Sequence, residues 1–280
     1  MEMLVSAQWL AAELGSADLV VLDCSTYLPN ESGNKHDGFR TAHIPGARLF
    51  DIDAIADAET DLPHMVPTPA RFARMVGALG VSNASRVVFY DQHGLRSSPR
   101  GWWMMRLFGH DQVAVLDGGL PGWVKAGHAV ATGDAPPAAA AAFVPDFRAA
   151  MLAGIGDVKR IVADGSALVL DARAKGRFEG SAPEPRAGLP SGHMPGAANV
   201  PATEMSGPDG RMKDAAALRA IFAAAGATGG RPVVTSCGSG VTACVLAFGM
   251  VRAGLPEPAV YDGSWTEWAS RPETIKEKSA

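Results

Sequence analysis

The chain has 280 residues and a formal net charge of −4, and this length predicts two domains of ordinary size. Hydrophobic residues make up 47% of the sequence and charged residues 19%, which excludes an intrinsically disordered chain. Because the net charge is acidic and the arginines are isolated, an extended basic surface for nucleic acid or an anionic membrane is excluded as well.

The first predicted element is an amphipathic helix that follows Ser6, a residue type that caps helix N-termini. The segment before it carries an acid, Glu2, where a signal peptide needs basic residues. No run reaches the ~18 apolar residues that a membrane span requires. Three cysteines give no disulfide framework and suit a reducing compartment. We therefore expect a cytoplasmic protein without a membrane segment.

One pattern of elements then occurs twice along the chain. Each copy has an apolar run that ends in Asp, a His-x-Pro-Gly turn, a second apolar run that leads into a helix, and a closing strand with Asp-Gly and Trp. The matching pairs are Asp23 and Asp171, His43 and His193, Asp91 and Cys237, and Trp123 and Trp268. Their separations range only from 268 − 123 = 145 to 193 − 43 = 150 residues. Such constant spacing indicates a duplicated domain.

Each copy alternates short β-branched runs with helical patterns, which predicts an α/β domain with a parallel sheet covered by helices on both faces. The segment 131–146 is rich in Ala and Pro and predicts an extended linker between the copies. In such sheets the chemistry lies at the carboxyl ends of the strands. The residues at that position are Asp91 in the first copy and Cys237 in the second.

Cys237 opens the sequence Cys-Gly-Ser-Gly-Val-Thr between a strand and a helix. Gly238 and Gly240 allow positive φ and have no Cβ to stop backbone N–H groups from turning inward. A thiolate in this loop also faces the positive end of the following helix. We therefore expect Cys237 to be a nucleophile in an anion cradle, and Cys24 and Cys244 to be buried core residues.

Two other kinds of site share this outline. Gly238-x-Gly240-x-x-Ala243 is a weak match to a dinucleotide-binding loop. The first copy lacks this pair of glycines, however, because Gln92 stands where the second has Gly238, and the acid that would bind a ribose, Asp262, repeats Asp117. A cysteine phosphatase needs an Arg six residues after its Cys to clamp phosphoryl oxygens, and Ala243 stands there. NAD is therefore disfavoured, and a thiol phosphatase stays open only as a rival.

The duplicated domain with Cys in the second copy only, and the loop from Cys237 to Thr242, resemble the rhodanese superfamily, in particular its 3-mercaptopyruvate sulfurtransferase branch. The resemblance covers nearly the whole chain. It implies a rhodanese-like domain over 1–130, a linker over 131–146 and a catalytic rhodanese domain over 147–280. The first domain is expected to be catalytically silent, because the carboxylate of Asp91 cannot carry a sulfane sulfur.

The resemblance implies that Cys237 takes sulfur from 3-mercaptopyruvate as a persulfide, releases pyruvate, and passes the sulfur to an acceptor. The acceptor would be a thiol, such as thioredoxin or glutathione, or cyanide. The backbone amides that would hold the persulfide, without a metal or an organic cofactor, belong to Gly238, Gly240, Val241 and Thr242.

A thiosulfate:cyanide sulfurtransferase is the alternative enzyme. That branch of the superfamily carries basic side chains directly after its cysteine, where this sequence has Gly238 and Ser239. A non-catalytic rhodanese-like module that binds partners also stays open.

Arg177 and Arg186 lie in a Pro- and Gly-rich loop of the second copy. Two guanidinium groups there could bind the carboxylate and the ketone oxygen of a 2-oxo acid, and the substrate-binding arginines of the family match them. Arg173 is nearer the strand and is expected to be structural. Close to the silent loop, Arg96, Ser97 and Arg100 are expected to be spectators.

Asp53 and His64 lie in a loop of the first copy that has no clear counterpart in the second. The resemblance implies a relay with Ser239, in which His64 moves a proton and Asp53 holds its tautomer. The sequence leaves open whether the three residues meet. His43 and His193 occur in both copies and are expected to be structural turn residues.

Overall fold

The computed structural model describes residues 1–135 and 137–279, and Pro136 of the predicted linker lies outside them. The strands form two five-stranded parallel sheets, in the order β1-β5-β4-β2-β3 and β6-β10-β9-β7-β8. The first sheet contains β1 (Leu4–Val5), β2 (Leu19–Asp23), β3 (Arg48–Leu49), β4 (Arg86–Tyr90) and β5 (Val113–Leu116). The second contains β6 (Leu152–Ala153), β7 (Leu168–Asp171), β8 (Ala198–Asn199), β9 (Val233–Ser236) and β10 (Ala259–Tyr261). Because the second order repeats the first strand for strand, the predicted duplication is confirmed.

Helices fill the connections between the parallel strands, and several begin at a residue whose side chain caps them, as Ser6 does by accepting a hydrogen bond from the Trp9 amide. In the first half they are α1 (Ala7–Glu13), α2 (Lys35–Thr41), α3 (Ile52–Ile55), α4 (Pro69–Ala78), α5 (Ser98–Leu107) and α6 (Gly119–Lys125). In the second half they are α7 (Ile155–Asp164), α8 (Lys175–Glu179), α9 (Ala215–Ala224), α10 (Ala243–Arg252) and α11 (Ser264–Ser270), with 3₁₀ turns η1 (Ala149–Met151) and η2 (Ala202–Met205). Within the described residues, each helix is too short or too polar to cross a bilayer.

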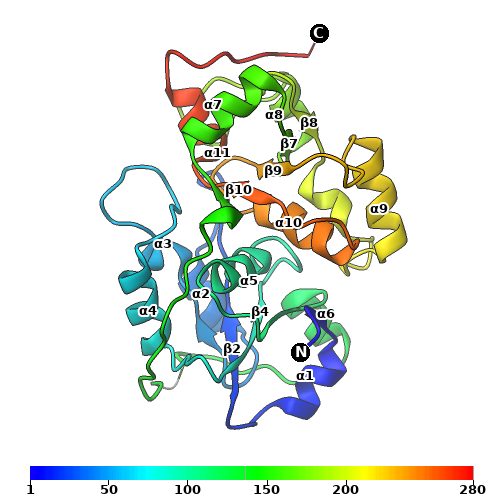
Figure 1. Cartoon of the computed structure of the whole chain (residues 1–280). Coiled ribbons are helices and arrows are strands. Elements are labelled where there is room, and N and C mark those ends of the chain that lie inside the picture. The colour runs from blue at the N-terminus through cyan, green and yellow to red at the C-terminus, as the bar shows by residue number, and fades with distance from the viewer. Residues whose placement is uncertain (136, 280) are drawn as a thin grey trace.

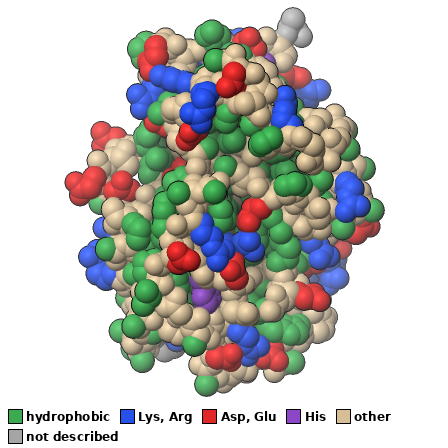
Figure 2. Space-filling model, in the orientation of Figure 1, with side chains coloured by type: hydrophobic (Ala, Val, Ile, Leu, Met, Phe, Trp, Pro, Cys, Tyr) green, Lys and Arg blue, Asp and Glu red, His purple; other side chains and the backbone are tan. Residues whose placement is uncertain are grey.

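Figure 1 shows two lobes, with the N-terminus in one lobe and the C-terminus in the other, and with α5 and α10 close to their junction. Successive side chains of a strand point alternately into two apolar layers. In β2, Leu22 joins the core between the lobes while Val21 packs under the outer helices. The face drawn in Figure 2 mixes Lys and Arg with Asp and Glu, without a large area of one charge. The alternation explains why strands buried on both faces read as continuous apolar runs.

The core between the lobes is continuous and contains residues of both sheets. Trp102 of α5 meets Phe248 of α10 edge to face, with ring centroids 4.9 Å apart. Polar contacts also cross the junction, since the Met212 amide donates to Asp117 at 2.8 Å. The two domains are therefore packed together through the elements that follow their corresponding loops.

The described part of the predicted linker, residues 131–135 and 137–146, has no helix or strand. It lies along the first domain, where Phe143 is buried and the Ala141 amide donates to the Gly77 carbonyl at 2.9 Å. The Asp146 amide donates to the carbonyl of Phe108. These contacts agree with an extended crossing, and the boundaries 1–130, 131–146 and 147–280 stay a prediction.

We expect Phe248→Ala to destabilise both domains together, because Phe248 is fully buried in the core that they share. The loss should be about 3–5 kcal/mol, measured by urea unfolding. Phe147→Ala is the matched control, since Phe147 is 40% exposed, and it should cost no more than about 1 kcal/mol. Two separate unfolding transitions, with only the second one shifted by Phe248→Ala, would contradict a shared core.

Candidate active site

Cys237 follows β9 directly and lies at a cavity of about 430 Å³ lined by both domains. Its side chain is nearly covered, with 2% of the residue exposed. From the second domain the lining includes Arg177, Arg186, Gly238, Ser239, Val241 and Thr242. From the first domain it includes Thr26, Tyr27, Leu28, His64, His93, Leu95 and Arg96. Most of the residues predicted from the sequence to form the site therefore share one cavity, while Asp53 contacts it through His64.

The loop of the first domain that begins at Asp91, called the silent loop, holds an anionic group. One carboxylate oxygen of Asp91 accepts hydrogen bonds from the amides of Arg96, Ser97 and Ser98 at 2.9–3.0 Å. The hydroxyl of Ser98 adds a fourth, at 2.7 Å, and the other oxygen accepts from the His93 amide. The N-terminus of α5 and its preceding loop therefore form a nest of donors around an anion.

The corresponding amides at the start of α10 are those of Thr242, Ala243 and Cys244. In the described chain the amides of Thr242 and Ala243 donate to no protein acceptor, while that of Cys244 donates to the Val241 carbonyl at 3.2 Å. Helix N-termini leave such donors unpaired unless a side chain or a ligand accepts from them. The second loop can thus offer to a sulfur anion on Cys237 two of the three amides that the first loop offers to Asp91.

The two glycines of the loop serve different ends. Gly240 has φ +78° and adopts the left-handed conformation that the sequence predicted. The same expectation is wrong for Gly238, which does not have positive φ. A Cβ on Gly238 would lie 2.9 Å from a guanidinium nitrogen of Arg177. Gly238 is therefore needed for the space that Arg177 occupies beside the cysteine.

Ser264 also supports the loop, and the sequence analysis missed it. Its hydroxyl oxygen accepts hydrogen bonds from the amides of Cys237 at 3.0 Å and Gly240 at 3.1 Å. It lies 3.9 Å from the Cys237 sulfur. Ser264 has φ +51°, a strained value for a residue with a side chain. Gly119 holds the matching position of the first copy, with φ +55°, so the exchange of Gly for Ser was the available signal.

His64 contacts two other predicted residues. Its Nδ1 lies 2.7 Å from a carboxylate oxygen of Asp53, and its Nε2 lies 3.3 Å from a guanidinium nitrogen of Arg186. Because a guanidinium group only donates, Nε2 is the acceptor in this contact and the ring proton lies on Nδ1. Nδ1 is close to the Asp53 carboxylate, but its direction gives no hydrogen bond there. The contact with His64, together with Lys35, holds the pKa of Asp53 well below its ordinary value.

The predicted relay is only partly assembled in this state. His64 and Ser239 line the same cavity, but among the described residues no hydrogen bond joins them, and Arg186 holds the nitrogen that Ser239 would need. The predicted triad therefore has a close His64–Asp53 pair and a separate Ser239, and its role stays a prediction.

The two predicted substrate-binding arginines have different surroundings. Arg177 is paired through two nitrogens with Glu184, at 2.6 and 3.2 Å. Arg186 has no acidic partner within the described residues, and burial lowers its pKa from the ordinary value. A guanidinium group stays charged even so. Arg186 is therefore the cation of the cavity that is open to an anionic ligand.

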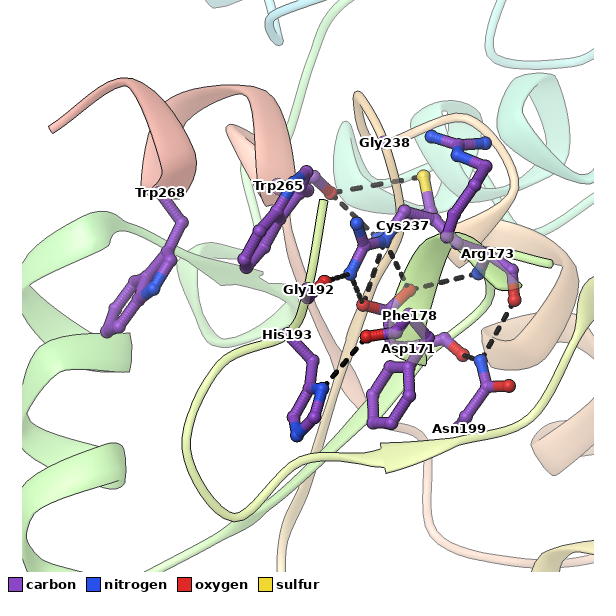
Figure 3. Close-up of polar contacts among 12 residues, drawn as sticks. Asp171, Arg173, Phe178, Gly192, His193, Asn199, Cys237, Gly238, Trp265 and Trp268 are labelled. Carbon is purple, nitrogen blue, oxygen red and sulfur yellow. Dashed lines mark hydrogen bonds and ion pairs between the residues drawn. The ribbon is translucent and has the colours of Figure 1, made fainter. Parts of the chain in front are cut away.

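Arg173 is structural, as the sequence predicted. It is fully buried and pairs with Asp171 and Glu184 at 2.6 and 2.9 Å. Its guanidinium group lies over the ring of Trp265, 4.3 Å from the centroid, in the cluster of Figure 3. In both copies the turn histidine is buried and its Nδ1 contacts a carbonyl, that of Phe178 in the case of His193, which confirms the structural reading.

The expectation that Arg96, Ser97 and Arg100 are spectators stays a prediction, but the structure gives the two arginines contacts around the site that the sequence did not predict. Arg96 lines the cavity. Arg100 is fully buried and donates to the His64 carbonyl at 2.6 Å. The sequence could not show this, because both contacts cross from the silent loop region to other parts of the chain. Among the described residues, no group of three or more His, Cys, Asp or Glu side chains could hold a metal ion.

Comparison with known proteins follows the same division of the chain. The model of the family described as "Rhodanese-like domain" matches twice, over residues 6–126 and 155–271. The chain belongs to the rhodanese-like domain family. In this rhodanese the loop after the central strand begins with a cysteine, Cys237, in the second domain and with Asp91 in the first.

Relatives of this rhodanese resemble it along almost its full length. It is 42% identical to an Arabidopsis thaliana protein named thiosulfate/3-mercaptopyruvate sulfurtransferase 1, mitochondrial, over 97% of this chain and 77% of the relative. It is 41% identical to the human 3-mercaptopyruvate sulfurtransferase, over 97% and 94%. The crystal structure of an Escherichia coli 3-mercaptopyruvate sulfotransferase superposes with a TM-score of 0.84 at 35% identity, over 95% of this chain and 99% of the other.

We expect Gly240→Ala to destabilise this rhodanese by more than about 1 kcal/mol, because Gly240 needs positive φ and a Cβ there would lie 2.8 Å from the backbone oxygen of Asp262. Gly238→Ala should cost less, since the atom it meets is the flexible end of Arg177. Urea unfolding of both variants tests the difference. Equal losses of unfolding free energy in the two variants would contradict the different roles assigned to Gly238 and Gly240.

We expect the stabilising effect of Asp53 to depend on pH. Its folded-state pKa lies below the ordinary value, so its contribution is complete above about pH 4 and is lost as the pH falls through the folded-state pKa. The contribution should not exceed about 1 kcal/mol, because the Asp53 side chain is 54% exposed.

The difference in melting temperature between the parent protein and Asp53→Asn should therefore narrow in acid. Asp53 lies in helix α3 and not in the loop that the sequence predicted. Asp61→Asn, which changes an exposed carboxylate between α3 and His64, should have little effect at any pH. A difference for Asp53→Asn that widens as the pH falls would refute the ion pair as its source.

Proposed function

We propose that this rhodanese is a sulfurtransferase that takes sulfur from 3-mercaptopyruvate onto Cys237 and passes it to a thiol or to cyanide. The carrying observation is the cavity itself, where Cys237, the amides at the start of α10 and the unpaired guanidinium group of Arg186 come together. The printed names of the human and Escherichia coli relatives support the same donor.

In the first half-reaction the Cys237 thiolate attacks the sulfur of the donor. A sulfur–sulfur bond forms, the carbon–sulfur bond breaks, and its electron pair stays on carbon as the enolate of pyruvate. The S–H proton of the new persulfide is then available for the enolate carbon. His64 can relay it, because its Nε2 carries a lone pair and Asp53 faces its Nδ1.

Each charge in this step has a partner in the cavity. Arg186 would bind the donor carboxylate and release His64 Nε2 from its present contact. Arg177, with two of its nitrogens on Glu184, would face the ketone oxygen with the rest of its guanidinium group. The amides of Gly238, Val241 and Thr242 are proposed to hold the persulfide anion that remains. The Gly240 amide, which the sequence also placed in this role, donates to the Ser264 hydroxyl instead.

In the second half-reaction an acceptor thiolate or cyanide attacks the outer sulfur and restores the Cys237 thiolate. The cavity is larger than the donor needs, since cavities of about 300–1,000 Å³ enclose drug-sized ligands. Thioredoxin, glutathione and cyanide remain the proposed acceptors. We further propose a reducing compartment, the cytoplasm, because Cys237, Cys24 and Cys244 are all free thiols.

Thiosulfate is the second candidate donor, favoured by the printed name of the Arabidopsis thaliana relative. Thiosulfate is a dianion that needs neighbouring positive charge, and Gly238 and Ser239 supply none next to Cys237. Arg177 is already neutralised by Glu184. We therefore propose that 3-mercaptopyruvate is the preferred donor.

Side-by-side transfer from 3-mercaptopyruvate and from thiosulfate to cyanide tests the proposal. Turnover should be faster with 3-mercaptopyruvate, and Cys237→Ser should abolish it while leaving the melting temperature unchanged. Cys24→Ser is the matched control, because Cys24 is buried in the first domain and its sulfur already contacts the Ser97 carbonyl.

The other outcomes separate the rivals. Faster turnover with thiosulfate would support the alternative enzyme. A protein that turns over neither donor and forms no persulfide detectable by mass spectrometry would be a binding module. Hydrolysis of an aryl phosphate that depends on Cys237 would support a phosphatase.

We expect Arg186→Gln to lower kcat/KM for 3-mercaptopyruvate about 10–100-fold, because a hydrogen bond to a charged group contributes about 1.5–3 kcal/mol. Most of the change should fall on KM, with the fold unaffected, since among the described residues the Arg186 guanidinium group has a polar contact with His64 and no ion pair. Arg186→Lys should recover part of the loss by restoring the charge. An unchanged KM in Arg186→Gln would remove Arg186 from donor binding.

A further inference from the structure

Arg100 is the third residue of α5 in the silent domain, and its side chain is fully buried at the junction with the catalytic domain. One terminal nitrogen lies 2.7 Å from a carboxylate oxygen of Asp262 and donates to the Gly240 carbonyl at 3.4 Å. The other donates to the His64 carbonyl at 2.6 Å. A single guanidinium group therefore contacts the cysteine loop and the residue that carries the imidazole.

The contact with His64 is made at a strained point of the backbone. His64 has φ +63°, a left-handed value that residues with a side chain seldom adopt. Such strain persists only where the surroundings fix it. Two residues further along the chain, the Val66 amide donates to Asp262, the ion-pair partner of Arg100, at 2.6 Å. Arg100 and Asp262 thus hold the His64 loop from both sides.

The duplicated design alone does not account for Arg100. The third residue of α10 in the catalytic domain is Val245, an ordinary core residue. Asp91 fixes the start of α5 through the amides of Ser97 and Ser98, which sets the direction from which Arg100 reaches the junction. The loop of the first domain therefore fixes the helix that carries this arginine.

Stability alone does not explain the buried ion pair of Arg100 and Asp262, since an apolar pair of similar volume is often as stable. Such a pair does fix geometry. The groups that it fixes here, the Gly240 carbonyl and the His64 backbone, belong to the cysteine loop and to the proposed proton relay.

We propose that Arg100 is a positioning residue that acts through His64, so that the silent domain supplies the orientation of the imidazole toward Cys237. The proposal rests on the proposed function. It assigns to the silent domain a part in the reaction, although its own loop is filled by Asp91.

A double-mutant cycle of Arg100→Lys and His64→Gln tests the proposal, with kcat measured on whichever donor the parent protein turns over. Lysine keeps the charge beside Asp262 but cannot also reach the His64 carbonyl in the geometry of the guanidinium fork. Misplacing a reacting group by about 1 Å can cost 100-fold in rate. We expect Arg100→Lys to lower kcat about 10–100-fold in the parent protein and less than about twofold in the His64→Gln background.

An equal loss of kcat in both backgrounds would overturn the proposal, because a general effect on the fold does not depend on His64. An unchanged kcat for Arg100→Lys in the parent protein would overturn it as well. If Arg100→Lys does not fold, Arg100→Met combined with Asp262→Asn removes both charges and enters the same cycle. A parent protein that turns over neither donor refutes the proposed function instead, so the two failures are distinct.

Discussion

The organising constraint of this protein is that a helix which starts directly after a parallel strand leaves backbone N–H groups without partners. In the first domain these groups have a partner within the protein, because the Asp91 carboxylate accepts hydrogen bonds from the amides of Ser97 and Ser98. In the second domain a thiol stands at that place, and the amides of Thr242 and Ala243 donate to no protein acceptor in the described chain. The same fold thus gives one closed anion site and one open site beside the Cys237 thiol.

The domains are unequal in chemistry yet inseparable in structure. Their inner sheet faces share a core in which α5 and α10 pack together, with Trp102 against Phe248. The cavity lies between them, so its walls come from both. The first domain is therefore more than a duplicate, because it supplies His64 and Arg100 to the junction with the Cys237 domain.

The arginines around the cavity differ in whether a carboxylate neutralises them. Arg173 and Arg177 share Glu184, and Arg173 also pairs with Asp171. Arg186 has no acidic partner among the described residues and lies against His64 Nε2. An anionic ligand would therefore gain most from Arg186, since no carboxylate competes for it. Its arrival would also free His64, which couples binding of a carboxylate to the availability of a proton acceptor.

The sequence by itself determined the duplication, the α/β fold, the strands of each sheet centre and the place of Cys237, because apolar periodicity and glycine placement are local properties. It did not reveal the two-residue edge strands, which are too short to show a pattern. Only the tertiary structure decided that His64 meets Arg186, that Gly238 leaves room for Arg177, and that Ser264 and Arg100 support the loop. These contacts join residues far apart in the chain, and their spacing carries no trace of the packing that brings them together.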